Sequence, residues 1–196
     1  MKISNIVGLS IIALVVVVIG THINNVPKLD ENVKSSWSQV ENQYKRRYDL
    51  IPNLVSTVKG YASHEKETLQ SVVEARAKVG QVNLDAKNLS NPELFGAFNK
   101  AQSGLSGALS KLMLVVERYP DLKANKNFMA LQSQLEGTEN RISVARRDYI
   151  QSVKKYNIEL RTFPGKLVAS VFHPEASVKE TFNATVEERS NPKVKF

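Results

Sequence analysis

The chain contains no cysteine among its 196 residues. This absence excludes disulfide bonds, thiolate metal sites and a lipid-modified N-terminal cysteine, but it does not fix the compartment, because a chain without thiols is compatible with either side of a membrane. Histidine is scarce as well, with three residues, and none of them follows a glutamate at the Glu-x-x-His spacing that di-iron helical bundles use. We therefore expect no metal and no cofactor.

Recognisable catalytic motifs are also missing. The sequence "HEKET" at residues 64–68 resembles a zinc-protease motif, but Thr68 stands where the second histidine is required. The chain contains neither a glycine-rich phosphate loop nor a G-x-S-x-G elbow. These absences argue against an enzyme, although a site assembled from distant residues would escape such a scan.

The charge is strongly unbalanced, with a formal net charge of +8 and a pI of about 9.6. Anionic lipid, an acidic cell-wall polymer and nucleic acid are all electrostatically compatible with this excess. The basic residues form pairs, and their alternative interpretation is a solvated surface combined with internal ion pairing. Nucleic acid is not an expected partner, because charge alone supports it.

The N-terminus carries the clearest signal, an apolar stretch at residues 3–23 without a formally charged side chain. As a helix, this stretch spans roughly 31 Å at about 1.5 Å per residue, close to the hydrocarbon thickness of a bilayer. The alternatives are a cleaved signal peptide and a buried core helix. A cleaved signal peptide is disfavoured because the region after the apolar block lacks small residues in an A-x-A pattern. A buried core helix is disfavoured because such a helix would normally show one polar face. We predict a single-pass anchor in the cell (inner or cytoplasmic) membrane, and the nearly balanced flanking lysines leave its orientation open.

The remaining sequence predicts an all-α fold. Apolar residues recur at helical spacing over 33–79, 92–119 and 124–162, and no alternating pattern is long enough for a sheet. We predict an up-and-down antiparallel bundle of three to four long helical segments. The expected domains are a membrane anchor at 1–25, the bundle at 26–163 and an extended or partly disordered tail at 164–196.

Arg47 has an unusual position in the first helical segment. It lies three residues after Tyr44 and four before Ile51, on the stripe that is expected to be buried. A charge there must be paired, since its desolvation would otherwise cost on the order of several kcal/mol. Glu139 and Arg146 flank the seam of the last helix and have suitable chemistry. We predict an internal polar network, in preference to a ligand site, made of Arg46, Arg47, Asp49, Glu139 and Arg146.

Pro52 predicts a joint in the same segment. It cannot donate to the carbonyl group of Tyr48, and its ring crowds that turn, so Asp49 is placed to cap a restarted helix. Whether the joint at 48–52 is a kink or a full reversal stays open, with the short connection favouring a kink. At the other end of the chain, Val194 and Phe196 in "NPKVKF" could add a strand to a partner domain of the PDZ type.

Several long blocks resemble one known family. They include "LDENVKSSWSQVENQYKRRYDLIPNLVSTVKGYASHE" at 29–65, "EAR" at 74–76, "ERYPDLKANKNFMALQSQLEGTENRISVARRDY" at 117–149 and "TFPGKLVA" at 162–169. On these blocks the chain resembles the LemA family. The resemblance implies a membrane-anchored bundle of four up-and-down helices with no assigned catalytic activity, an outside amino terminus, a cytoplasmic body and an association with membrane proteases.

The leading functional hypothesis is a non-enzymatic interaction or scaffold module that is tethered to the bilayer through residues 3–23 and engages another membrane protein. A membrane protease is the class of partner that the family resemblance implies. No small-molecule substrate is evident. The alternative is a binding module that holds anionic lipid or cell-wall polymer on a basic face. The partner, the oligomeric state and the physiological role are not specified by the sequence.

Overall fold

The computed structural model describes residues 8, 10, 13, 17 and 20–182, and every regular element in that part of the chain is a helix. This confirms the all-α prediction. The helices are α2 (Asn25–Tyr61), α3 (Lys66–Gln81), α4 (Pro92–Val116), α5 (Pro120–Lys123), α6 (Lys126–Arg161) and α7 (Gly165–Phe172).

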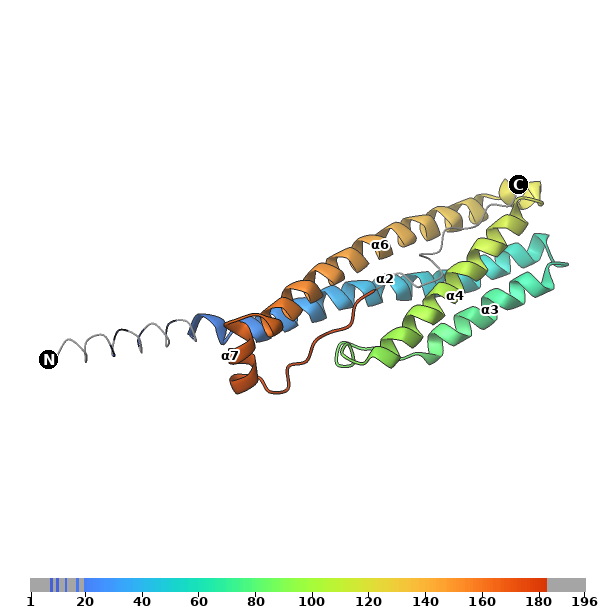
Figure 1. Ribbon diagram of the computed structural model, residues 1–196. Coiled ribbons are helices and arrows are strands. Elements are labelled where there is room, and N and C mark those ends of the chain that lie inside the picture. Colours follow the sequence, from blue (N-terminus) through green and yellow to red (C-terminus); the bar gives the residue numbers. More distant parts are fainter. Residues whose placement is uncertain (1–7, 9, 11–12, 14–16, 18–19, 183–196) are drawn as a thin grey trace, which may run out of the picture.

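The two longest helices, α2 and α6, run antiparallel along the length of the molecule, and α3 and α4 form a hairpin beside the half of α2 that is remote from the N-terminus (Figure 1). The four long helices therefore alternate in direction, which confirms the predicted antiparallel bundle. Because α3 and α4 are shorter than α2 and α6, the half of the molecule near the N-terminus is completed by α7 and the segment that follows it (Figure 1).

A reversal at residues 48–52 and a helix restarted at Asp49 are both wrong, whereas a kink at Pro52 stays a prediction. Helix α2 continues through Pro52 to Tyr61, and the chain reverses at residues 62–65. Asp49 is exposed inside this continuous helix and so cannot serve as the cap of a new one. The sequence does not reveal the real turn, because Val58 and Leu69 continue the apolar pattern across it.

Two asparagine caps define the starts of α4 and α6. The side chain of Asn91 accepts hydrogen bonds from the amides of Glu93 and Leu94 at 3.0 and 3.1 Å. Asn125 accepts in the same way from the amides of Asn127 and Phe128, at 2.9 and 3.0 Å. Each cap satisfies amides that the first helical turn leaves free.

The core consists of two apolar clusters with a polar layer between them. The proximal cluster, near the N-terminal end of the bundle, is centred on Trp37, and the distal cluster includes Leu54 and Leu112. Among the described residues, the polar or charged side chains in the buried class are Arg47, Gln102 and Thr138, and these form the polar layer. On α2, Arg47 separates Tyr44 of the proximal cluster from Ile51 of the distal one.

The described part of the predicted tail is more ordered than expected. Residues 165–172 form α7, and the segment after it packs into the bundle. The hydroxyl group of Tyr149 donates to the carbonyl oxygen of Glu180 at 2.8 Å, and the amide of Glu180 donates to the carbonyl oxygen of Leu89 at 2.8 Å. Phe182 is buried against Trp37 and Tyr149. Residues 165–182 therefore contribute to the core.

Most of the predicted membrane span at 3–23 lies outside the described residues. Within the residues that the structure does describe, no helix is long and apolar enough to cross a membrane.

Candidate functional site

The polar layer is organised around Arg47, whose side chain α2 directs into the bundle. The side chain is 2% exposed because its position falls on the buried stripe of α2. Its Nη1 atom donates to Ser106 Oγ and to Glu139 Oε1, both at 2.9 Å. Its Nη2 atom donates to the Oε1 atom and, at 3.4 Å, to the backbone carbonyl oxygen of Gln102. One guanidinium group thus connects α2, α4 and α6.

The two charges of this ion pair differ strongly in burial. The Glu139 side chain is 43% exposed, whereas that of Arg47 is 2% exposed. Glu139 therefore retains contact with water, and the desolvation cost falls mainly on Arg47. The guanidinium group also lies 5.0 Å from the centre of the Tyr44 ring, a distance that permits a cation–π interaction.

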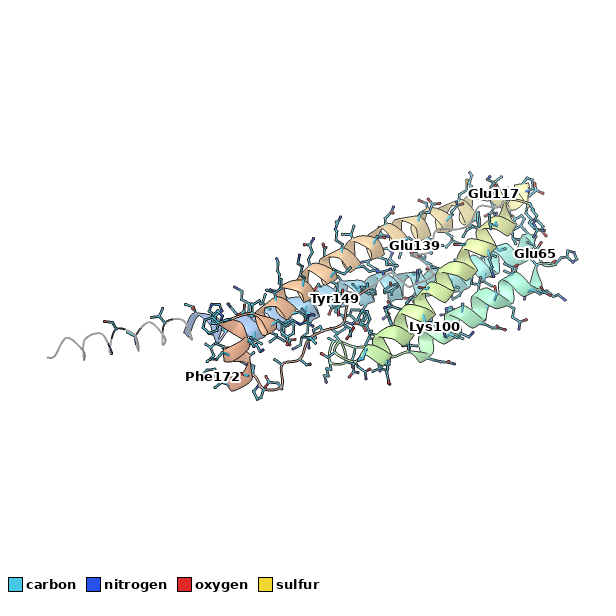
Figure 2. All side chains as sticks on the ribbon, viewed as in Figure 1. Glu65, Lys100, Glu117, Glu139, Tyr149 and Phe172 are labelled. Atoms are coloured by element: carbon cyan, nitrogen blue, oxygen red, sulfur yellow. The ribbon has the colours of Figure 1, made fainter. Side chains whose placement is uncertain are left out.

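A polar cavity of about 230 Å³ adjoins this pair between α2, α4 and α6. Two guanidinium groups and one carboxylate lie on its wall, together with amides and hydroxyl groups. Figure 2 shows Glu139 on α6 at this level of the bundle. The lining consists of Tyr44, Arg47, Asn99, Gln102, Ser103, Ser106, Glu139, Ile142, Ser143 and Arg146.

The cavity lining offers hydrogen-bonding groups. Burial raises the pKa of Tyr44, with Arg146 and Arg47 opposing the shift, so its phenol is protonated at neutral pH and does not act as a base. The lining contains neither histidine nor cysteine. Among the described residues, no group of three histidine, cysteine, aspartate or glutamate side chains could hold a metal ion. This arrangement can stabilise contacts between helices or bind a small polar molecule.

The other residues of the predicted network are distributed differently. Arg146 lines the cavity, and its guanidinium group lies 4.3 Å from the centre of the Phe182 ring. Arg46 and Asp49 are exposed on α2 and are not among the cavity residues. The structure thus brings Arg47 and Glu139 into direct contact and places Arg146 beside them, while the stabilising role of this set stays a prediction.

A second polar contact was not predicted from the sequence. Pro52 has no amide hydrogen, so the carbonyl oxygen of Tyr48 loses its usual helical donor. Arg76 on α3 supplies a donor, with its Nε atom 3.2 Å from that oxygen and its guanidinium group 3.7 Å from the centre of the Tyr48 ring. At Gly80, a Cβ atom would lie 3.3 Å from the Tyr48 hydroxyl oxygen. Helix α3 therefore supplies the hydrogen-bond donor that Pro52 cannot give to the Tyr48 carbonyl oxygen.

The proposed partner-binding residues of the tail cannot be placed. Val194 and Phe196 lie outside the described residues, so strand addition to a partner stays a prediction.

Known proteins show clear similarity to the chain. Magnetosome protein MamQ 2 of Paramagnetospirillum magneticum is 27% identical over 180 residues, which is 83% of this chain and 65% of that protein. Protein LemA of Metamycoplasma hominis is 29% identical over 142 residues, which is 71% of this chain and 60% of that protein. The chain therefore spans less than two thirds of the length of these relatives. The LemA family model matches residues 36–196, most of the sequence, and the chain belongs to the LemA family.

Proposed function

We propose that this chain is a single-pass membrane protein whose helical bundle acts as a non-enzymatic interaction or scaffold module. The apolar stretch at residues 3–23 supplies the anchor in this proposal. The long antiparallel helices α2 and α6 give the bundle the shape of a rod (Figure 1). Its exposed helix faces are the surfaces on which a partner would bind.

The observation that supports this proposal best is that the guanidinium group of Arg47 is hydrogen-bonded within the bundle. A buried arginine beside a polar cavity is a candidate for substrate binding, but both terminal nitrogens of Arg47 are engaged with Gln102, Ser106 and Glu139. The group bridges three helices, and a fixed arrangement of those helices is what a rigid interaction module would require.

A membrane protein is the expected class of partner, and a membrane protease is the specific class that the family resemblance implies. Three of the relatives are named magnetosome proteins, and these names assign no reaction. The proposal accordingly includes no small-molecule substrate and no cofactor.

Site-specific photo-crosslinking tests the proposal. Val73 on α3 and Val144 on α6 are 51% and 46% exposed, so a photoreactive amino acid at either position samples a different face of the bundle without disturbing the core. The buried position Leu112 on α4 provides a control that should give internal products alone. We expect a discrete adduct with a membrane protein from one exposed face. An absence of adducts from every exposed face in intact membranes would contradict the proposal.

A second candidate function, binding of anionic lipid or cell-wall polymer, is favoured by one observation. The basic residues Lys45, Arg46, Arg147, Lys154 and Lys155 are all exposed. Sedimentation with anionic vesicles or cell walls should then be lost as salt rises, because salt screens exposed charges. Replacing Lys154 and Lys155 by glutamate should weaken binding to the vesicles or cell walls. The effect should exceed that of the same change at Lys100 and Lys111, which are exposed on α4.

A further inference from the structure

Helix α7 is fixed beside the point where the apolar N-terminal stretch ends. It packs inward through Gly165, Val168 and Ala169, which are buried against the bundle. A Cβ atom at Gly165 would collide with the backbone of α6, so this approach is as close as the chain allows. The Nε2 atom of His173, directly after α7, lies 2.8 Å from the carbonyl oxygen of Ile23 and can donate to it.

The exposed side of α7 carries several large apolar side chains beside the exposed Lys166 and Ser170. In the turn before the helix, Phe163 is 82% exposed, and Leu167, Val171 and Phe172 are 51%, 63% and 45% exposed. A surface helix in water normally turns a polar face outward, and contiguous exposed apolar side chains mark an interaction site. Figure 2 places Phe172 at the end of the molecule where α7 meets the start of α2.

The position of this face favours lipid as its occupant. Ile23 is the last residue of the predicted span, and α2 begins at Asn25, so there is no linker that could hold α7 away from the bilayer surface. Exposed cations adjoin these residues in the sequence at Arg161 and Lys166, with an exposed carboxylate at Glu175, and Lys28 is exposed in the first turn of α2. An apolar face bordered by basic residues is typical of segments that lie in the headgroup region.

We propose that the apolar face of Phe163, Leu167, Val171 and Phe172 docks on the lipid bilayer at headgroup depth, so that the bundle has a second membrane contact beside its anchor. This proposal rests on the proposed membrane anchoring. It sets the tilt of the bundle, because a rod held at two adjacent points cannot pivot freely on its anchor.

Single-cysteine labelling of the full chain tests this contact, and the natural absence of cysteine leaves each introduced thiol unique. The chain is reconstituted in vesicles of phosphatidylcholine and phosphatidylglycerol and labelled with an environment-sensitive fluorophore in the variants Leu167→Cys, Leu114→Cys and Val17→Cys. Leu114 is a matched control, since it is a leucine that is 72% exposed near the opposite end of the bundle. Val17 reports on the anchor itself.

We expect the label at Leu167 to be quenched by a lipid with a quencher at headgroup depth and protected from aqueous iodide. The label at Leu114 should show the reverse, and the label at Val17 should be quenched from the bilayer interior. Iodide quenching at Leu167 with lipid quenching at Val17 would overturn the docking contact and leave the anchor intact. Iodide quenching at Val17 would overturn both. Protection of Leu167 from iodide and from lipid quenchers alike would mean that protein covers the face, which also overturns the proposal.

Discussion

The polar layer predicts an asymmetry between the two ends of one ion pair. Arg47→Met removes the buried charge, whereas Glu139→Gln keeps a hydrogen-bond acceptor for Arg47 and removes only the compensating charge. Arg47 is 2% exposed and Glu139 is 43% exposed. Glu139→Gln therefore leaves a buried charge without its partner, whereas Arg47→Met leaves an unpaired charge that is in contact with water. We expect Glu139→Gln to destabilise the bundle more than Arg47→Met.

The magnitudes follow from these burials. Removing the partner of a fully buried charge costs about 3–5 kcal/mol, and the exposure of Glu139 reduces the expected loss to about 2 kcal/mol. Arg47→Met leaves Glu139 free to turn toward water, and its cost is mainly the lost hydrogen bonds to Gln102 and Ser106, about 1 kcal/mol because both groups border the polar cavity. Glu136→Gln is the matched control, since Glu136 is exposed one turn away on α6, and it should change the stability by less than about 0.5 kcal/mol.

Equilibrium unfolding in urea measures these differences in detergent-solubilised full chain. Trp37 is the single tryptophan and is fully buried, so its fluorescence reports the loss of the proximal cluster, and circular dichroism reports the loss of helix. Equal losses for the two variants, or a larger loss for Arg47→Met, would refute the view that the buried arginine depends on the charge of Glu139.

Three further results are expected. Arg76→Met should lower the free energy of unfolding by about 1 kcal/mol in the native background. The loss should be smaller in a Pro52→Ala background, because residue 52 regains an amide donor there. Additive losses in this double-mutant cycle would contradict the contact between Arg76 and the Tyr48 carbonyl oxygen. Phe182→Ala should cost about 3 kcal/mol in urea unfolding, and Phe163→Ala, at a position that is 82% exposed, less than about 0.5 kcal/mol. Burial, with nearby acidic charges, raises the pKa of Tyr156 to about 12, above the usual value of about 10, so its contribution to stability is fully present below pH 10 and is lost as the pH rises toward 12. Tyr156→Phe should reduce this pH dependence in unfolding experiments at fixed salt.

The bundle was predictable because its periodicity is local. The stripe through Phe128, Leu135, Ile142, Tyr149 and Tyr156 predicts a helix over 124–162, and α6 occupies 126–161. The turn at 62–65 was not predictable in the same way, because the apolar spacing continues across it. Pro52 does not end α2, and the cost of a proline inside a helix depends on whether another group can supply the missing donor, as Arg76 does here.

The polar residues were only partly predictable from the sequence. The stripe position of Arg47 indicates burial, and the need for a partner indicates Glu139, but the contacts to Gln102 and Ser106 depend on how α4 packs. The same holds for Phe182, which enters the core from a segment with no periodicity of its own. Contacts between elements distant in the sequence require the assembled fold.

Alkaline carbonate extraction of membranes from cells that express the full chain tests the central claim most directly. A bundle tethered by a spanning anchor at residues 3–23 should stay in the membrane pellet, and a variant without those residues should be released. Recovery of the full-length chain in the carbonate supernatant would contradict the account.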